Sequence, residues 1–80
     1  MLRLFAFSGV ETDWVAASNE AAARQELINH YGISEREVAG SYESVSEVDP
    51  NKVKLGTDEM TTAAAIMVGK TRPFLVGSTC

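Results

Sequence analysis

The stretch LRLFAFSGVETDWVAASNEAAARQELINHYG, residues 2–32, decides the fold that this sequence predicts. It opens with an apolar run that ends at Ser8-Gly9, and a second run over residues 13–17 follows a connection of hairpin length. Short apolar runs bounded by turn residues are typical of strands, and a short loop that contains glycine is typical of a hairpin. We therefore expect two antiparallel strands, over residues 2–7 and 13–17.

A helix is predicted directly after these strands, to about residue 31. Ser18 or Asn19 is the expected N-cap, because either side-chain oxygen can accept a free backbone N–H. Gly32 stands where a left-handed C-cap is expected. The apolar residues with the spacing of one helical face are Ala23, Leu27 and Tyr31. This face should pack against the sheet, with Leu27 buried.

The middle of the chain predicts shorter elements. Residues 34–37, SERE, match a capping box, and the short helix that they begin should end at Gly40. Residues 41–48 alternate imperfectly and predict an edge strand or extended segment, with room for a bulge. Residues 52–55, KVKL, alternate strictly and predict a half-exposed strand.

One alternative stays open near the C-terminus. Thr57-Asp58-Glu59 predicts the start of a helix that Gly69 ends, whereas a strand over residues 63–68 is the alternative. Residues 74–76 predict the last strand. The whole chain, residues 1–80, is predicted to be a single α+β domain: a small antiparallel sheet (β-β-α-β-β-α-β) with helices packed on one face.

The composition argues against several classes of function. The chain has 80 residues with a net charge of −4, which disfavours a general nucleic-acid binder or a protein of anionic membrane surfaces. One cysteine and one histidine leave little material for a disulfide framework, a zinc site or catalysis. We therefore predict a protein that is not an enzyme, with no catalytic residues, no cofactor and no metal. The longest strongly apolar run, residues 63–68, is too short for a membrane span, which predicts a cytoplasmic protein.

Three sequence features could carry chemistry, and each is better explained without it. His30 falls in the last turn of the predicted helix, where the helix dipole favours a cation. Cys80 is interpreted as a thiol in a flexible tail. Gly69-Lys70-Thr71 resembles the end of a phosphate-binding loop, but Ala64 stands where that motif needs a glycine, and Pro73 follows closely.

The acidic residues are unevenly distributed. All eleven lie between Glu11 and Glu59, and the densest part contains one base, Arg36. The five candidate partner-binding residues in that part are Glu35, Glu37, Glu43, Glu47 and Asp49. A negative surface can simply keep a small protein soluble. It can also dock in a basic groove of a partner, where it would compete with nucleic acid.

Several segments together resemble a group of small phage and prophage proteins. The similar segments are TDWVAASNEAAAR (12–24), YG (31–32), EVDPNKVKL (47–55) and FLVGST (74–79). In that group they correspond to a strand end, a helix rich in alanine and glutamate, a V-D-P turn and a terminal strand. Small, acidic α+β phage proteins of this kind resemble anti-CRISPR proteins of the type I class, type I-C among them.

The resemblance implies a phage or mobile-element protein that acts by binding. The expected partners are protein subunits of a host type I CRISPR-Cas surveillance complex (Cascade) in the bacterial cytoplasm, with no direct contact to nucleic acid or membrane. Binding would block the entry of target DNA. The alternative is an orphan phage accessory or structural protein that acts as a homo-oligomer without a CRISPR partner. A homodimer stays open in either case.

Overall fold

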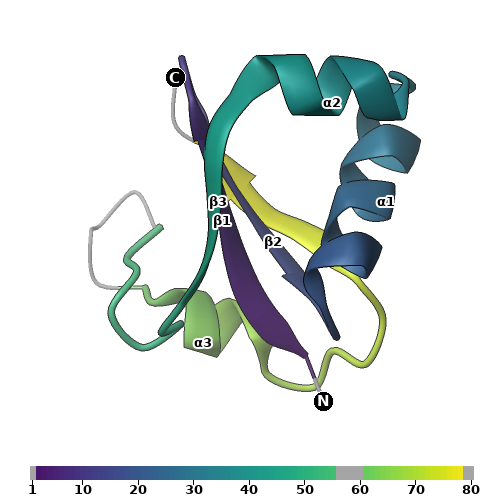
Figure 1. Ribbon diagram of the computed structural model, residues 1–80. Helices are drawn as coiled ribbons and strands as arrows, with labels where there is room; N and C mark the ends of the chain where they lie inside the picture. The colour runs from purple at the N-terminus through teal and green to yellow at the C-terminus, as the bar shows by residue number, and fades with distance from the viewer. Residues whose placement is uncertain (1, 56–60, 79–80) are drawn as a thin grey trace.

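The computed structural model describes residues 2–55 and 61–78, which form one four-stranded sheet and three helices (Figure 1). In chain order the elements are β1 (Arg3–Gly9), β2 (Thr12–Ala17), α1 (Glu20–Tyr31), α2 (Glu35–Ser41), β3 (Tyr42–Val48), α3 (Ala63–Met67) and β4 (Phe74–Ser78). The strand order is β3-β1-β2-β4, and every neighbouring pair is antiparallel. The predicted α+β class, the antiparallel sheet and the initial hairpin are confirmed.

Both faces of the central hairpin are covered. On the face toward α1 and α2, the buried cluster consists of Phe5, Phe7, Val15, Ala17, Ala23, Leu27 and Val38. Leu4 and Ala16 alternate with these strand residues and are also fully buried. Figure 1 shows α3 on the side of the sheet opposite α1, so the third helix does not share the face of the other two. The reason is that the apolar residues of the second face also need to be covered.

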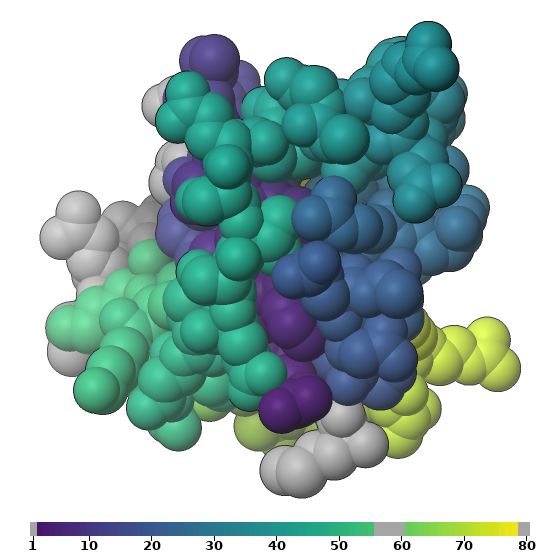
Figure 2. All heavy atoms as spheres, viewed as in Figure 1, coloured from purple at the N-terminus to yellow at the C-terminus, as the bar shows by residue number. Residues whose placement is uncertain are grey.

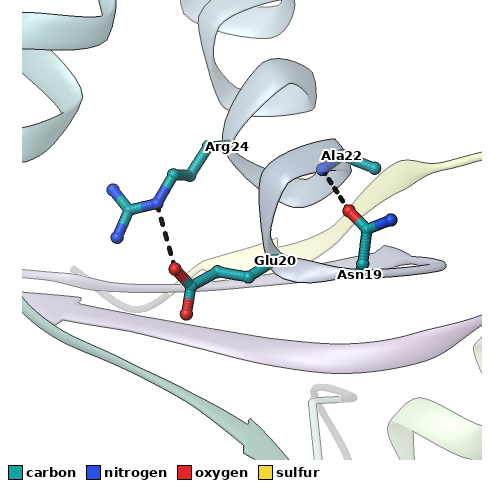
Figure 3. Close-up of polar contacts among 4 residues, drawn as sticks. All are labelled: Asn19, Glu20, Ala22 and Arg24. Atoms are coloured by element: carbon teal, nitrogen blue, oxygen red, sulfur yellow. Dashed lines mark hydrogen bonds and ion pairs between the residues drawn. The ribbon is translucent and has the colours of Figure 1, made fainter.

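Local capping fixes α1 at both ends. Asn19, not Ser18, is the N-cap: its side chain accepts a hydrogen bond of 2.8 Å from the backbone N–H of Ala22 (Figure 3). At the C-terminal end, Gly32 has φ 67° and its N–H donates to the Ile28 carbonyl at 2.9 Å. A left-handed cap of this kind favours glycine because a Cβ is disfavoured there. The predicted helix and the full burial of Leu27 are confirmed.

The edge strand β3 contains the bulge that its irregular pattern predicted. Ser8 pairs with Ser44 and Gly9 pairs with Tyr42, so Glu43 has no partner on β1. In a regular strand, Tyr42 and Val45 would lie on opposite faces because an odd number of positions separates them. The extra residue of the bulge lets both pack against the buried cluster.

Helix α2 continues through the expected stop at Gly40 and passes directly into β3. The capping prediction is confirmed, since Ser34 accepts from the Glu37 N–H at 3.2 Å.

The predicted strand over residues 52–55 is wrong. Lys54 makes one isolated bridge, to Thr62, and the segment joins no sheet strand. Its backbone pairs instead with the residues that lead into α3, through Leu55 N–H to the Thr61 carbonyl (2.9 Å) and Ala63 N–H to the Val53 carbonyl (2.8 Å).

The choice left open for residues 63–68 is resolved in favour of the helix. Thr62 is the N-cap of α3, and its side chain accepts from the Ala65 N–H at 3.2 Å. The start expected at residues 57–59 lies outside the described residues. The last strand, β4, runs to Ser78 and is therefore longer than predicted.

Candidate functional site

The five predicted partner-binding residues are all exposed, and they lie on two consecutive elements and the residue that follows the second. Glu35 and Glu37 are in the first turn of α2, Glu43 and Glu47 are on β3, and Asp49 follows β3. We call this set the α2–β3 acidic surface. Figure 2 views the molecule from the side on which α2 and β3, in teal, cover much of the front. The carboxylates are spread along both elements, because α2 and β3 meet end to end at an angle (Figure 1).

Three of the five carboxylates already have partners. Glu47 forms an ion pair of 3.1 Å with Arg3. Asp49 accepts hydrogen bonds from the backbone and side chain of Asn51, and Glu37 accepts from the Ser34 hydroxyl at 3.4 Å. Two carboxylates remain without a side-chain partner among the described residues. These are Glu35 and Glu43.

The bulge changes one expectation about this surface. Strand alternation predicts that Glu43 and Glu47 leave β3 on the same face. Glu43 is the bulge residue, however, so alternation no longer fixes the direction of its side chain. The surface is therefore better described as two separate groups of charge, one on α2 and one along β3.

A buried carboxylate, Asp13 on β2, was not among the candidates predicted from the sequence. It is 3% exposed and is the one buried charged residue among those that the structure describes. Three hydroxyl groups donate to it: Tyr31 to Oδ1 at 3.2 Å, Tyr42 to Oδ2, and Ser78 to Oδ1. These donors come from the end of α1, the start of β3 and the end of β4. Asp13 thus ties four elements together at one end of the sheet.

Tyr42 shows the strongest electrostatic effect of this cluster. Burial raises the pKa of its hydroxyl above the usual 10.0, and the hydrogen bond to Asp13 and the negative charge of Asp13 raise that pKa further. The neutral hydroxyl is therefore the form that the fold stabilises. Beside the cluster lies an open hollow of about 340 Å³. Its lining residues are Val10, Glu11, Asp13, Gly40, Ser41 and Tyr42.

The other sequence candidates lie apart from this cluster or outside the described residues. His30 is exposed in the last turn of α1, and its ring packs edge-to-face on Tyr31 with centroids 4.9 Å apart. Helix α3 ends at Met67, so Lys70 does not begin a helix as a phosphate-binding loop would require. Cys80 lies outside the described residues.

The described residues contain no group of three or more histidine, cysteine, aspartate or glutamate side chains placed to hold a metal ion. Within the same residues, no helix has the length and apolar character that crossing a bilayer requires. The features that remain to be explained are the Asp13 cluster and the charged surfaces. No protein-family model matches the chain, and comparisons with curated proteins and with solved structures found no match either.

Proposed function

We propose that this protein acts by binding, and that its α2–β3 acidic surface docks in a basic groove of a protein that binds nucleic acid. The observation that supports this most directly is that residues 35–49 carry five exposed carboxylates and a single base, Arg36, with Arg3 of β1 paired to one of the five, Glu47. Such a surface steers encounter with a cationic groove and helps to fix the orientation of the complex. Occupation of the groove would exclude nucleic acid.

The partner that we propose is a type I CRISPR-Cas surveillance complex (Cascade) in a bacterial host. The resemblance to small phage proteins supports this choice, and so does the net charge of −4 on a chain of 80 residues. The protein would contact Cascade protein subunits where target DNA enters, and would not contact nucleic acid itself. It would act as an inhibitor without carrying out a reaction.

The test uses the two carboxylates that have no structural partner. The double variant Glu35→Lys and Glu43→Lys changes the net charge from −4 to 0, since each reversal adds two positive charges. The matched control, Glu20→Lys and Glu26→Lys, gives the same net charge but changes only α1 and leaves α2 and β3 unchanged. Both pairs leave the ion pair of Glu47 with Arg3 in place.

Inhibition is measured as the concentration of this protein that prevents Cascade from shifting labelled target DNA in a native gel. We expect the Glu35/Glu43 variant to need at least about tenfold more protein than the wild type, and the control to stay close to the wild type. Equal inhibition by the two variants would show that net charge, not this surface, matters. If the wild type binds no type I Cascade, the proposed partner is wrong.

A second candidate, a homo-oligomer without a CRISPR partner, is supported by the edge strand β4. Among the described residues this strand pairs with β2 alone and carries no charged residue, whereas the opposite edge, β3, carries two glutamates. Charges on an edge strand oppose pairing with other chains, and their absence leaves β4 less protected. Light scattering in reductant tests this candidate, because a mass near 8.6 kDa would exclude a stable dimer and with it the homo-oligomer.

A further inference from the structure

The turn between α3 and β4 forms two adjoining surface hollows that share one residue, Lys70. The first hollow has a volume of about 340 Å³ and the second about 290 Å³. The first is lined by Gly69, Lys70, Thr71, Arg72, Pro73 and Phe74. The second is lined by Leu2, Pro50, Ala64, Met67, Val68 and Lys70. One hollow is thus cationic and the other is almost entirely apolar.

The cationic hollow is lined by two positive groups, Lys70 and Arg72, and by one aromatic ring, Phe74. The Lys70 ammonium lies 6.0 Å from the centroid of the Phe74 ring, which is held in the sheet by the pairing of Phe74 with Ala16. Arg72 is exposed and has no ion pair among the described residues. Neither hollow is lined by a carboxylate within the described part of the chain. This hollow therefore fits an anionic group.

The apolar hollow is anchored by backbone contacts on two sides. The Ala64 N–H donates to the Pro50 carbonyl at 3.1 Å, which holds α3 against the segment after β3. Gly69, with φ 78°, reverses the chain after α3, and the Lys70 N–H donates to the Met67 carbonyl at 3.0 Å. Val68 is left 77% exposed at the rim. Val68 and the half-buried Met67 therefore offer apolar surface beside this hollow.

We propose that the two hollows form one binding site for an extended, acidic and apolar peptide segment of a partner protein. A carboxylate of the segment would pair with Lys70 and Arg72, and a neighbouring apolar side chain would cover Val68 and Met67. Lys70 lies between the two halves, so a carboxylate and an adjacent apolar group can be bound together.

Charge complementarity favours a peptide over a polyanion. The site carries two cations on a protein whose net charge is −4, so a nucleic acid or an anionic membrane would be repelled by the rest of the molecule. A segment with one or two carboxylates avoids most of that repulsion and uses the apolar hollow. This inference does not depend on the proposed function, because none of the residues that line the two hollows belongs to the α2–β3 acidic surface.

The probe is a fluorescein-labelled peptide of sequence Gly-Asp-Leu-Leu-Asp-Gly, and binding to the full chain is followed by fluorescence anisotropy. We expect the Lys70→Glu and Arg72→Glu double variant to raise the Kd at least about tenfold, and Val68→Ser to raise it about threefold. The matched control, Lys52→Glu and Lys54→Glu, has the same net charge of −8, since each pair subtracts four from −4, and should keep the wild-type Kd. Circular dichroism verifies that each variant is folded.

Several outcomes would overturn this inference. One is the absence of binding to the wild type at about 1 mM peptide, which is the weak end of specific affinities. A second is equal binding of the peptide in which Asn replaces both Asp residues, because the cationic half would then play no part. A third is an unchanged Kd for Val68→Ser, because the apolar hollow would then contribute nothing to peptide binding. A fourth is displacement of the labelled peptide by single-stranded DNA or by anionic vesicles at a lower concentration than the unlabelled peptide requires, which would assign the site to a different class of ligand.

Discussion

Replacement of Asp13 by alanine tests whether the buried carboxylate organises this end of the fold. The change removes the acceptor of three hydroxyl groups, which come from Tyr31, Tyr42 and Ser78. A polar group that loses its hydrogen-bond partner lowers stability more when it is buried than when it is exposed and can form a hydrogen bond with water instead. The exposure of the three donors therefore decides the size of the effect.

Tyr42 should contribute most to the loss. A hydrogen bond to a charged group contributes about 1.5–3 kcal/mol, and the half-buried Tyr42 hydroxyl regains water only in part. Tyr31 is 45% exposed and Ser78 is exposed, so water replaces much of what they lose. Removal of the buried carboxylate also relieves its own desolvation cost, which offsets part of the loss. We expect Asp13→Ala to lower the free energy of unfolding by about 2–4 kcal/mol, out of roughly 4–12 kcal/mol for a chain of 80 residues.

Urea unfolding at neutral pH measures this change, with Glu43→Ala as the control. Glu43 is exposed and has no side-chain partner among the described residues, so its removal should change stability by less than about 0.5 kcal/mol. A double-mutant cycle of Asp13→Ala with Tyr42→Phe isolates the pair, and we expect a coupling of at least about 1 kcal/mol. A loss below about 1 kcal/mol for Asp13→Ala, or a coupling near zero, would refute the reasoning.

Three further predictions concern the core, the sheet edge and the tyrosine. Leu27→Ala should lower the free energy of unfolding by about 2–5 kcal/mol in urea titrations, because a fully buried side chain leaves a cavity, and a loss under about 1 kcal/mol would contradict its core position. Gly9→Ala should lower the free energy of unfolding by about 1–3 kcal/mol in thermal unfolding, because a Cβ there would overlap the backbone carbonyl of Ser41. A variant as stable as the wild type would show that the backbones of Gly9 and Ser41 can move apart. Because the pKa of Tyr42 is raised above its usual 10.0, the contribution of its hydroxyl is complete well below pH 10.0 and is lost progressively as the pH rises above that value. The stability difference between wild type and Tyr42→Phe should therefore be constant at neutral pH and shrink above about pH 10, and a difference that stays constant there would contradict this.

The first half of the fold could be predicted because its signals are local. The cap at Asn19 and the left-handed residue Gly32 each act within one helical turn. The hairpin of β1 and β2 needs only a short loop between two apolar runs. The spacing of Leu27 on its helix then identifies the side that packs on the sheet. None of these inferences requires knowledge of distant partners.

The failures occurred where distant partners decide the structure. Residues 52–55 have the alternation of a strand, but the segment pairs with the residues that lead into α3 and not with either edge strand of the sheet, β3 or β4. The position of α3 depends on the second apolar face of the sheet. Leu4 and Ala16 form part of that face, but this becomes clear only from the pairing of β1 with β2.

Asp13 was missed for the same reason. Its hydroxyl donors are 18, 29 and 65 residues away in sequence. One signal was present: Asp13 alternates with Val15 and Ala17 on β2, which places a carboxylate at an inward position.

The Asp13 cluster also affects how the α2–β3 acidic surface should be tested. Tyr42 is the first residue of β3 and directly follows α2, so its bond to Asp13 fixes the point where the two acidic elements meet. If the protein binds as proposed, a variant at Asp13 or Tyr42 is expected to weaken binding by displacing the carboxylates, without changing the charge of the α2–β3 acidic surface. Loss of binding in such a variant, with stability also reduced, would reveal nothing about charge. The reversal of Glu35 and Glu43 leaves this junction intact, and it therefore separates the contribution of charge from that of the fold.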